Sequence, residues 1–133
     1  GTTLAYAVLD PRTDKFLGIT AYLDPSTEHR HLEVGMTAYA REVQGTAINP
    51  AAKHLLLGHA FESGALRVQF QIDARNTRSQ AAVLKLGATR EGTLRQHKVI
   101  ASGYVRNTCF FSILKDEWPS VRAGLETRLA AFA

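Results

Sequence analysis

The chain has 133 residues, of which 45% are apolar and 21% are charged, and this composition predicts one globular domain and excludes a disordered chain. No apolar run approaches the roughly 20 residues that cross a bilayer, and residues 1–20 lack the pattern of a signal peptide, so we expect a cytoplasmic protein with no membrane partner. The single cysteine, Cys109, excludes an internal disulfide and is expected to be a buried thiol.

The net charge of +4 is unevenly distributed along the chain. Residues 1–66 carry 5 Lys/Arg against 7 Asp/Glu, a balance of −2, whereas residues 67–133 carry 11 against 5, a balance of +6. A basic second half attracts anionic ligands such as a phosphorylated cofactor, and it would equally suit nucleic acid or simply be a solvated surface. Aromatic and basic residues do not alternate there, so we expect no nucleic-acid partner.

The first 40 residues predict three strands. Residues 4–9 and 15–23 are rich in strand-forming residues and are joined by a turn at residues 10–14, and turn-forming residues follow from 24 to 30. Residues 31–39 alternate between apolar and other side chains, so Glu33 is expected to point away from the more apolar face of this strand.

A helix, a strand and a second helix are predicted next. Asn49 is expected to cap the first helix, with Pro50 at its first position and a stop at Gly64. Residues 55–57, 60 and 61 are apolar around most of this helix, so it should be covered on more than one side. Residues 66–72 alternate strictly as a strand.

The second helix is expected to open with a capping box of Thr77 and Gln80 and to end at Gly87. On this helix Ser79 begins a stripe that continues through Ala82, Val83 and Leu86 at helical spacing, and we expect the stripe to be buried.

The last elements are a hairpin and a helix. Residues 88–100 and 104–114 should pair, and the second of these strands is apolar on both faces and therefore central or covered. Pro119 should start a helix whose apolar stripe is Val121, Leu125, Leu129 and Phe132. The predicted order is β-β-β-α-β-α-β-β-α, an α+β fold with a mixed sheet.

A glycine-bearing loop precedes the first predicted helix. Residues 43–50 read Val-Gln-Gly-Thr-Ala-Ile-Asn-Pro, and backbone N–H groups that lead into a helix start bind anions because they lack intrahelical partners. We therefore expect a cofactor that contains a pyrophosphate. A plain connecting turn is the alternative interpretation.

Several segments together resemble one family. Residues 44–62 resemble the cofactor-binding segment of the GNAT superfamily of acetyl-coenzyme A (acetyl-CoA) dependent N-acetyltransferases. Residues 73–82, 85–95 and 102–119 are similar to the D-x-x-N-x-x-S, K-L-G-A, E-G-x-L-R and closing-hairpin motifs of its RimJ/RimL-like branch. The resemblance covers residue 15 to the C-terminus and implies one GNAT domain over residues 1–133. Its sheet would be mixed, mostly antiparallel and twisted, with about six strands flanked by helices.

The chain departs from the family in two places. Gln44–Ala47 reads Gln-Gly-Thr-Ala where many members have a Gly-x-Gly or Gly-x-Ala core, which leaves less backbone freedom. Members usually carry a strand and two helices ahead of the strands found here, and those helices form one wall of the acceptor pocket. We therefore expect an N-terminally truncated domain.

The resemblance implies roles for particular residues. Glu33 would take a proton from the attacking amine, a backbone N–H at Met36 or Thr37 would bind the oxyanion, and the Ser79 hydroxyl would protonate the departing thiolate. The remaining donor-binding residues would be Gln44, Gly45, Thr46, Ala47, Ile48, Asn49, Asn76 and Arg78.

Simpler interpretations stay open for these residues. Glu33 could be a surface carboxylate, Ser79 a contributor to the helix cap, Asn76 a turn former and Arg78 a surface arginine. His54 and His59 stand five apart, a spacing that does not place two metal ligands on one helix face, so we expect no metal.

The implied activity is transfer of the acetyl group of acetyl-CoA to a primary amine through a tetrahedral intermediate. The acceptor would be a protein N-terminus or a small-molecule amine, and a homodimer is possible. The alternative is a non-catalytic coenzyme A (CoA) binding module, or a fragment that needs a partner to complete its acceptor site.

Overall fold

The computed structural model describes residues 1–132, in which six strands and three α-helices follow one another in the predicted order. The strands are β1 Thr3–Leu9, β2 Phe16–Ser26, β3 His31–Tyr39, β4 Arg67–Asp73, β5 Thr89–Val99 and β6 Val105–Leu114. The helices are α1 Ile48–Glu62, α2 Thr77–Leu86 and α3 Trp118–Ala130, with short 3-10 helices at η1 Arg41–Val43 and η2 Lys115–Glu117.

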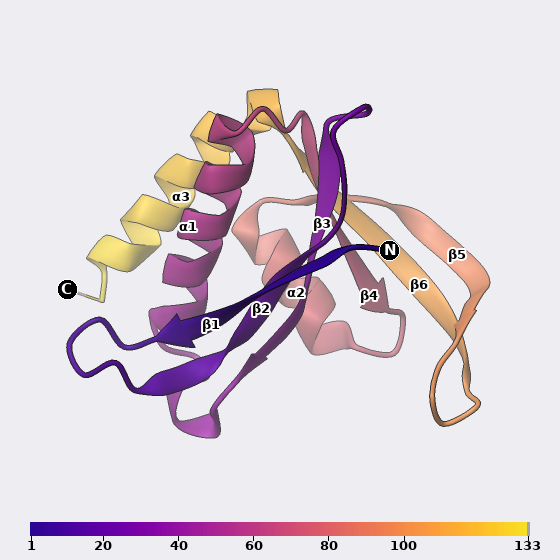
Figure 1. Ribbon diagram of the computed structural model, residues 1–133, viewed down its shortest axis with the longest axis horizontal. Coiled ribbons are helices and arrows are strands. Elements are labelled where there is room, and N and C mark those ends of the chain that lie inside the picture. The colour runs from indigo at the N-terminus through magenta and orange to yellow at the C-terminus, as the bar shows by residue number, and fades with distance from the viewer. Residues whose placement is uncertain (133) are drawn as a thin grey trace.

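All six strands form one twisted sheet in the order β1-β2-β3-β4-β6-β5 (Figure 1). Only β3 and β4 are parallel, because α1 connects them as a crossover, and every other neighbouring pair is antiparallel. The prediction of a mixed, mostly antiparallel sheet is confirmed. So is the prediction for residues 104–114, since β6 lies inside the sheet between β4 and β5.

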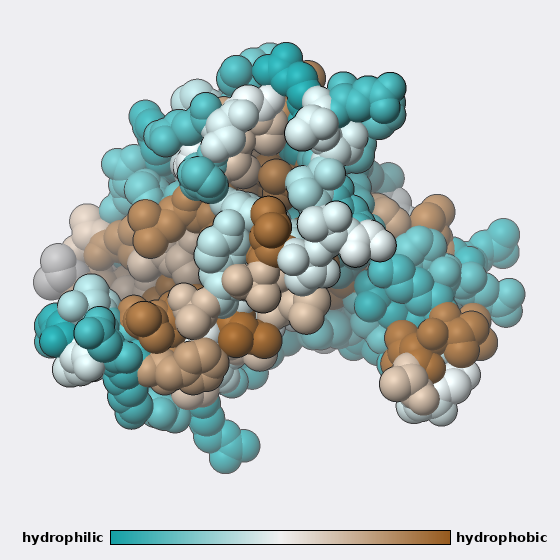
Figure 2. Space-filling view, viewed as in Figure 1, coloured by the Kyte–Doolittle hydropathy of each residue, from teal (hydrophilic) through white to brown (hydrophobic). Residues whose placement is uncertain are grey.

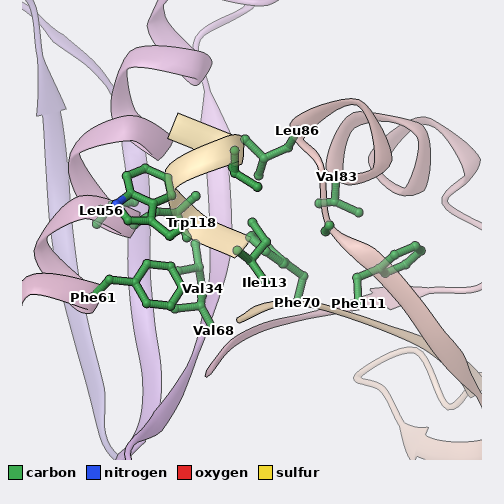
Figure 3. Close-up of a cluster of buried hydrophobic side chains, with 14 of the residues drawn as sticks. Val34, Leu56, Phe61, Val68, Phe70, Val83, Leu86, Phe111, Ile113 and Trp118 are labelled. Atoms are coloured by element: carbon green, nitrogen blue, oxygen red, sulfur yellow. The ribbon is translucent and has the colours of Figure 1, made fainter. Parts of the chain in front are cut away.

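The hydrophobic core lies between the three helices and one face of the sheet (Figure 3). Alternate residues of β4 and β6 enter it, and residues from α1, α2 and α3 cover them. Phe111, Ile113 and Val68 are fully buried there. The other face of the sheet carries no helix within residues 1–132, and it is termed the helix-free face below.

Helix α1 is covered on more than one side, as predicted. Leu57 and Phe61 are buried, and the Phe61 ring stacks on Trp118 of α3 with centroids 5.7 Å apart. Burial of each such side chain contributes about 1.5 to 3 kcal/mol. Leu55 is an exception because it is 72% exposed.

The predicted start of α1 is wrong by two residues. The helix begins at Ile48, the capping position is Ala47, and Pro50 stands third. The N–H of Ile48 donates to the Thr46 hydroxyl oxygen instead, at 3.3 Å, so Asn49 is not needed as a cap. Pro50 still fits because N–H groups of the first turn have no intrahelical partner.

The predicted cap of α2 is also displaced. Asn76, not Thr77, caps this helix, because its side-chain oxygen accepts from the Ser79 N–H at 3.1 Å. Gln80 donates to the Ala74 carbonyl at 3.0 Å rather than completing a capping box. The predicted stop at Gly87 is confirmed, since its φ of 113° is left-handed.

Two predicted apolar stripes are narrower than expected. On α2, Val83 and Leu86 are buried, but Ser79 is only half-buried and Ala82 is exposed, because α2 rests on the core along one narrow line. On α3, which begins at Trp118 and not at Pro119, the stripe ends before Phe132, which is 53% exposed.

The strand following β1 is longer than predicted. Strand β2 continues to Ser26 through an irregular register with β3, although the turn-forming residues suggested a loop from residue 24. Figure 2 shows hydrophilic residues gathered over the β5–β6 side of the molecule and an apolar patch at the tip of that hairpin. Val99 and Val105, the last pair of the hairpin, are both exposed. Among the described residues, no helix combines the length and apolarity that crossing a membrane requires.

Candidate active site

Strands β3 and β4 pair over only part of their lengths and then separate (Figure 1). Their parallel register joins residues 31–33 to residues 67–69, whereas β3 continues to Tyr39 and β4 to Asp73. Beyond these pairs neither facing edge has a partner strand among residues 1–132. Backbone groups on such edges can bond to an extended ligand.

A β-bulge lies in the separated part of β3. Opposite the single β2 residue Thr20, β3 has two residues, Met36 and Thr37. Met36 has a left-handed φ of 50° and is 57% exposed. A bulge interrupts the ladder and re-aims the backbone. Met36 and Thr37, the predicted oxyanion donors, therefore lie at a bulge where β3 has separated from β4. Their role as donors stays a prediction.

A buried lysine supports this bulge from the helix side. Lys53 of α1 is 7% exposed, and its Nζ donates to the Thr37 hydroxyl at 3.2 Å. That hydroxyl lies 2.9 Å from the Thr20 hydroxyl. Burial lowers the pKa of Lys53 from 10.5 to about 8, and within residues 1–132 no ion pair offsets this effect.

Sequence reasoning missed Lys53, although the signal was present. Lys53 precedes Leu56, Leu57 and Ala60 by three, four and seven residues, which places it on the face of α1 that these residues bury. A lysine on a buried helical stripe indicates a specific polar partner, here Thr37.

The loop between β3 and α1 presents unpaired backbone N–H groups. Gly45 has φ of 77°, and a Cβ added there would meet no atom within 4 Å. Within residues 1–132 the N–H groups of Gly45, Ala47 and Asn49 make no hydrogen bond. Together with the positive end of α1, such groups attract an anion.

One side chain of this loop ties it to the sheet, and another has an unsatisfied oxygen. Gln44 donates to the Tyr39 carbonyl at 3.1 Å and so ties the loop to the end of β3. Asn49 has a buried side-chain oxygen without a hydrogen-bond partner among the described residues. The predicted loop residues thus form one anion-attracting turn, and their contact with a ligand remains a prediction.

The start of α2 lies at the same edge of the sheet as this loop. Because β3 and β4 are parallel, their C-terminal ends share one edge, and the loop and Asn76 each follow one of these ends. The Asn76 oxygen is occupied by capping, Arg78 is exposed, and the Ser79 hydroxyl makes no hydrogen bond within residues 1–132. No hydrogen bond among these residues joins Ser79 to Glu33.

Arg75 is engaged within the chain. Its guanidinium pairs with Asp73 at 2.8 Å and lies over the Tyr104 ring at 3.4 Å from the centroid. The Arg75 guanidinium lowers the pKa of Asp73 to about 2. These contacts hold the β4–α2 loop against the β5–β6 hairpin.

Glu33 is a buried carboxylate on the helix-free face. It is 9% exposed, whereas its neighbour Val34 points into the core, so the predicted orientation of Glu33 is confirmed. A freely exposed surface carboxylate does not fit this burial. Burial raises the pKa of Glu33, and the nearby Lys98 and Arg106 cations partly oppose the rise. A carboxylate with a raised pKa is suited to accepting a proton.

A family model described as an acetyltransferase (GNAT) domain matches residues 1–89. The chain belongs to the GNAT family of acetyltransferases. Membership implies acetyl-CoA as the acetyl donor and an acceptor that receives the acetyl group. The matched part of this GNAT domain includes the separated strands, the bulge, the loop and α2.

Solved structures agree with this assignment. A protein from T. thermophilus, provisionally assigned as an acetyltransferase, is 43% identical with a TM-score of 0.88, covering 96% of this chain and 66% of its own. A GCN5-related N-acetyltransferase from Brucella melitensis is 27% identical with a TM-score of 0.89, covering 95% and 57%. The GNAT domain therefore spans less than two thirds of the length of these relatives.

The fold also extends to more distant enzymes. The spermidine/spermine N-acetyltransferase SpeG from Vibrio cholerae is 18% identical with a TM-score of 0.76, covering 89% of this chain and 68% of its own, a likeness in fold alone. No curated protein sequence matches the chain.

Proposed function

We propose that this GNAT domain transfers the acetyl group of acetyl-CoA to a primary amine by direct attack, as a member of the RimJ/RimL-like branch. The observation that carries the proposal is the separation of β3 from β4 beside the Met36–Thr37 bulge, with unpaired N–H groups at the same sheet edge. Acetyl-CoA is a thioester with a diphosphate at one end. The separated strands would receive its extended thioester arm, and the unpaired N–H groups would bind its diphosphate.

The donor would lie across this edge of the sheet. Within the predicted loop Gln44–Asn49, the free N–H groups of Gly45, Ala47 and Asn49 would bind its diphosphate. The unpaired edges of β3 and β4 would bond to the amides of its pantetheine arm. The free N–H₂ of Asn76 would assist that arm. Arg78 is exposed and would meet the nucleotide end by charge.

The acetyl transfer would use three groups of this chain. Glu33 would take the proton of the attacking amine directly or through one water, while the N–H of Met36 or Thr37 stabilises the tetrahedral oxyanion. As the carbon–sulfur bond breaks, the thiolate leaves. A free thiol has a pKa near 8.5, so a proton from the Ser79 hydroxyl would assist its departure.

The acceptor is a protein N-terminus or a small-molecule amine. An α-amino group has a pKa of about 7.7 to 8.0 and needs only mild assistance from a base, so either class fits Glu33. The V. cholerae protein is named for its polyamine substrates, but its likeness to this chain is in fold alone and does not identify the acceptor here.

The proposal is tested by donor binding and turnover. Titration calorimetry with CoA should give heat, and the amides of Gln44–Asn49 should be protected from hydrogen exchange in the complex. Ser79→Ala should lower turnover with acetyl-CoA while CoA affinity stays unchanged. Absence of heat and of amide protection would refute the proposed donor site, and full turnover by Ser79→Ala would remove this hydroxyl from the mechanism.

A non-catalytic CoA-binding module is the second candidate. It stays open because nothing among the described residues tests turnover, and the chain spans less than two thirds of the length of these relatives. Thiol release from acetyl-CoA with a panel of amines separates the two candidates. CoA binding without release for any amine would favour the module.

A further inference from the structure

Regular pairs of the β2–β3 ladder bound the Met36–Thr37 bulge on both sides. These pairs are Ala21 with Gly35 and Ile19 with Ala38. On the second side the two strands are so close that a Cβ added to Gly18 would collide with the Ala38 carbonyl oxygen. The ladder therefore fixes both ends of the bulge but not its middle, where two β3 residues face one β2 residue.

A hydrogen bond from α1 reaches the middle of the bulge. The Lys53 ammonium donates to the Thr37 hydroxyl at 3.2 Å, and the hydroxyls of Thr37 and Thr20 are 2.9 Å apart. Because an ammonium can only donate, Thr37 accepts from Lys53 and directs its own proton to Thr20, the nearer of its two acceptors. One ordered chain of hydrogen bonds thus joins α1, β3 and β2.

The titratable side chains around this chain of hydrogen bonds carry no negative charge. On the helix-covered face of the strands, the residues directly opposite or two positions from Thr20 and Thr37 include Tyr6 of β1, Tyr22 of β2 and Tyr39 of β3. Burial raises the pKa of Tyr22 and of Tyr39 to about 12, so both stay neutral near pH 8. On α1 itself, His59 stacks on Tyr22 with ring centroids 6.3 Å apart.

The surroundings of Lys53 do not make its charge stabilising. Within residues 1–132 no carboxylate pairs with this ammonium, and its three N–H donors make one side-chain hydrogen bond. A buried cation with so few partners lowers the stability of the fold, and an apolar side chain of similar length would avoid that cost. Its contact with the bulge is what distinguishes lysine from such a side chain.

We infer that Lys53 is a positioning residue for acetyl transfer, whose ammonium acts through the Thr37 hydroxyl to hold the Met36–Thr37 backbone where it binds the oxyanion. This inference rests on the proposed function. Lys53 is buried beneath α1, so it would act through Thr37 and not on the reacting atoms. Its positive charge, one hydrogen bond away from Thr37, would also favour the negative charge that develops beside the bulge.

The test replaces the ammonium by an uncharged side chain of similar length. Lys53→Met should lower kcat by roughly ten- to hundredfold, because a displaced donor stabilises the oxyanion poorly, with little change in the KM for acetyl-CoA. At pH 7 the variant should be at least as stable as wild type in denaturant unfolding. A purely structural lysine predicts the reverse, a less stable or unfolded variant with unchanged kcat per folded molecule. Lys115→Met removes an equal charge at an exposed position and should leave kcat unchanged.

A second variant tests the path through the hydroxyl. Thr37→Val keeps the shape and the backbone N–H of Thr37 but removes the hydroxyl, so it should lower kcat by a similar factor. The double variant of Lys53→Met and Thr37→Val should be no slower than the slower single variant, because both changes break the same contact. Effects that multiply would show that Lys53 does not act through Thr37.

The pH dependence gives a readout that a change in packing alone would not move. The ratio of wild-type kcat to Lys53→Met kcat cancels the titrations of the acceptor and of Glu33, which both enzymes share. This ratio should be largest at pH 7 and shrink as pH rises through about 8, because burial lowers the pKa of Lys53 to that value and the ammonium is lost above it. A ratio that stays constant up to pH 10 would show that the charge has no role.

The outcomes separate this inference from the proposed function. Unchanged kcat in Lys53→Met would overturn the inference while leaving acetyl transfer standing. No turnover by the wild type with any amine would overturn the catalytic proposal for this chain. In that case amide chemical shifts decide: those of Met36 and Thr37 should move in Lys53→Met, and unchanged shifts would show that Lys53 does not hold the bulge.

Discussion

At the scale of single residues, two ionisable side chains lie on opposite faces of the sheet at β3. Glu33 lies on the helix-free face and Lys53 reaches Thr37 from α1. Burial disfavours the charged form of each, so the pKa of Glu33 rises and that of Lys53 falls. Both shifts bring titration closer to neutral pH and give measurable consequences.

Replacement of Glu33 should impair proton transfer. Glu33→Gln should lower kcat by about 10²- to 10⁴-fold with little effect on the KM for acetyl-CoA. In the proposed role of Glu33 as the base, only its carboxylate form accepts a proton, so wild-type activity should be lost as pH falls through its pKa, which burial raises above 4.5. A pH–rate profile measures this. Glu28→Gln, at an exposed turn, is the matched control, and an unchanged kcat in Glu33→Gln would contradict the role.

Replacement of Lys53 should change the pH dependence of stability. The folded pKa of about 8 lies below the ordinary 10.5, so the unfolded state binds the proton first as pH falls. Wild-type stability should therefore decrease as pH falls from 10.5 to 8, by on the order of 3 kcal/mol, and be flat below that window. Lys53→Met should remove this decrease.

Denaturant unfolding at pH 7, 8, 9 and 10 checks the Lys53 prediction. The difference in unfolding free energy between Lys53→Met and wild type should favour the variant most at pH 7 and shrink as pH rises. Lys115→Met, at an exposed position, should show no such trend. Parallel pH curves for wild type and Lys53→Met would show that the ammonium is not disfavoured by folding.

At the scale of elements, the site depends on two strands that begin together and end apart. The parallel pairing of β3 with β4 stops after three residue pairs, and the bulge and the 44–49 loop follow on β3. Within residues 1–132 the facing edges of β3 and β4 have no partner strand there, and the N–H groups of Gly45, Ala47 and Asn49 make no hydrogen bond, so these backbone groups are available to a ligand. In the proposed function, this loop would bind the donor through N–H groups even though a second glycine is missing.

A side chain at position 45 should prevent the loop from binding CoA. Gly45→Val should weaken CoA binding by roughly tenfold or more, because a branched residue at a left-handed φ rearranges the N–H groups around it. Gly103→Val is the matched control, since Gly103 also has a left-handed φ of 87° and open space around its Cβ position. Calorimetry on both variants measures the effect. Equal Kd values for Gly45→Val and wild type would place the phosphates elsewhere.

At the scale of the whole molecule, one core holds all three helices against one face of the sheet. Trp118 joins the layers, since it is 7% exposed and its ring stacks on Phe61. The site is therefore positioned by the same core that stabilises the fold, because α1 carries Lys53 and Asn76 caps α2.

Loss of the Trp118 ring should destabilise the entire domain. Trp118→Ala should lower the free energy of unfolding by about 3 to 5 kcal/mol through lost burial and a cavity between α1 and α3. Leu55→Ala, at a 72% exposed position on α1, should cost far less. Denaturant titration compares them, and similar midpoints for the two variants would show that Trp118 does not join the layers.

The sequence predicted the order of all nine main elements and much of the candidate site. Strict alternation in residues 66–72 and the turn formers around them act over short distances, so periodicity was sufficient there. The loop at Gly45 and the cap region at Asn76 were likewise visible as local motifs. The caps themselves were misplaced by one or two residues, because a neighbouring hydroxyl or amide of similar chemistry competed for each N–H.

The sequence by itself determined which segments are strands and helices, and it pointed to the GNAT family, because periodicity and motifs are properties of neighbouring residues. Only the tertiary structure decided where β3 leaves β4, that Lys53 holds Thr37, and that Glu33 is buried on the helix-free face. Each of these depends on strand register and burial between segments distant in sequence, and neither property is recorded in any single local pattern.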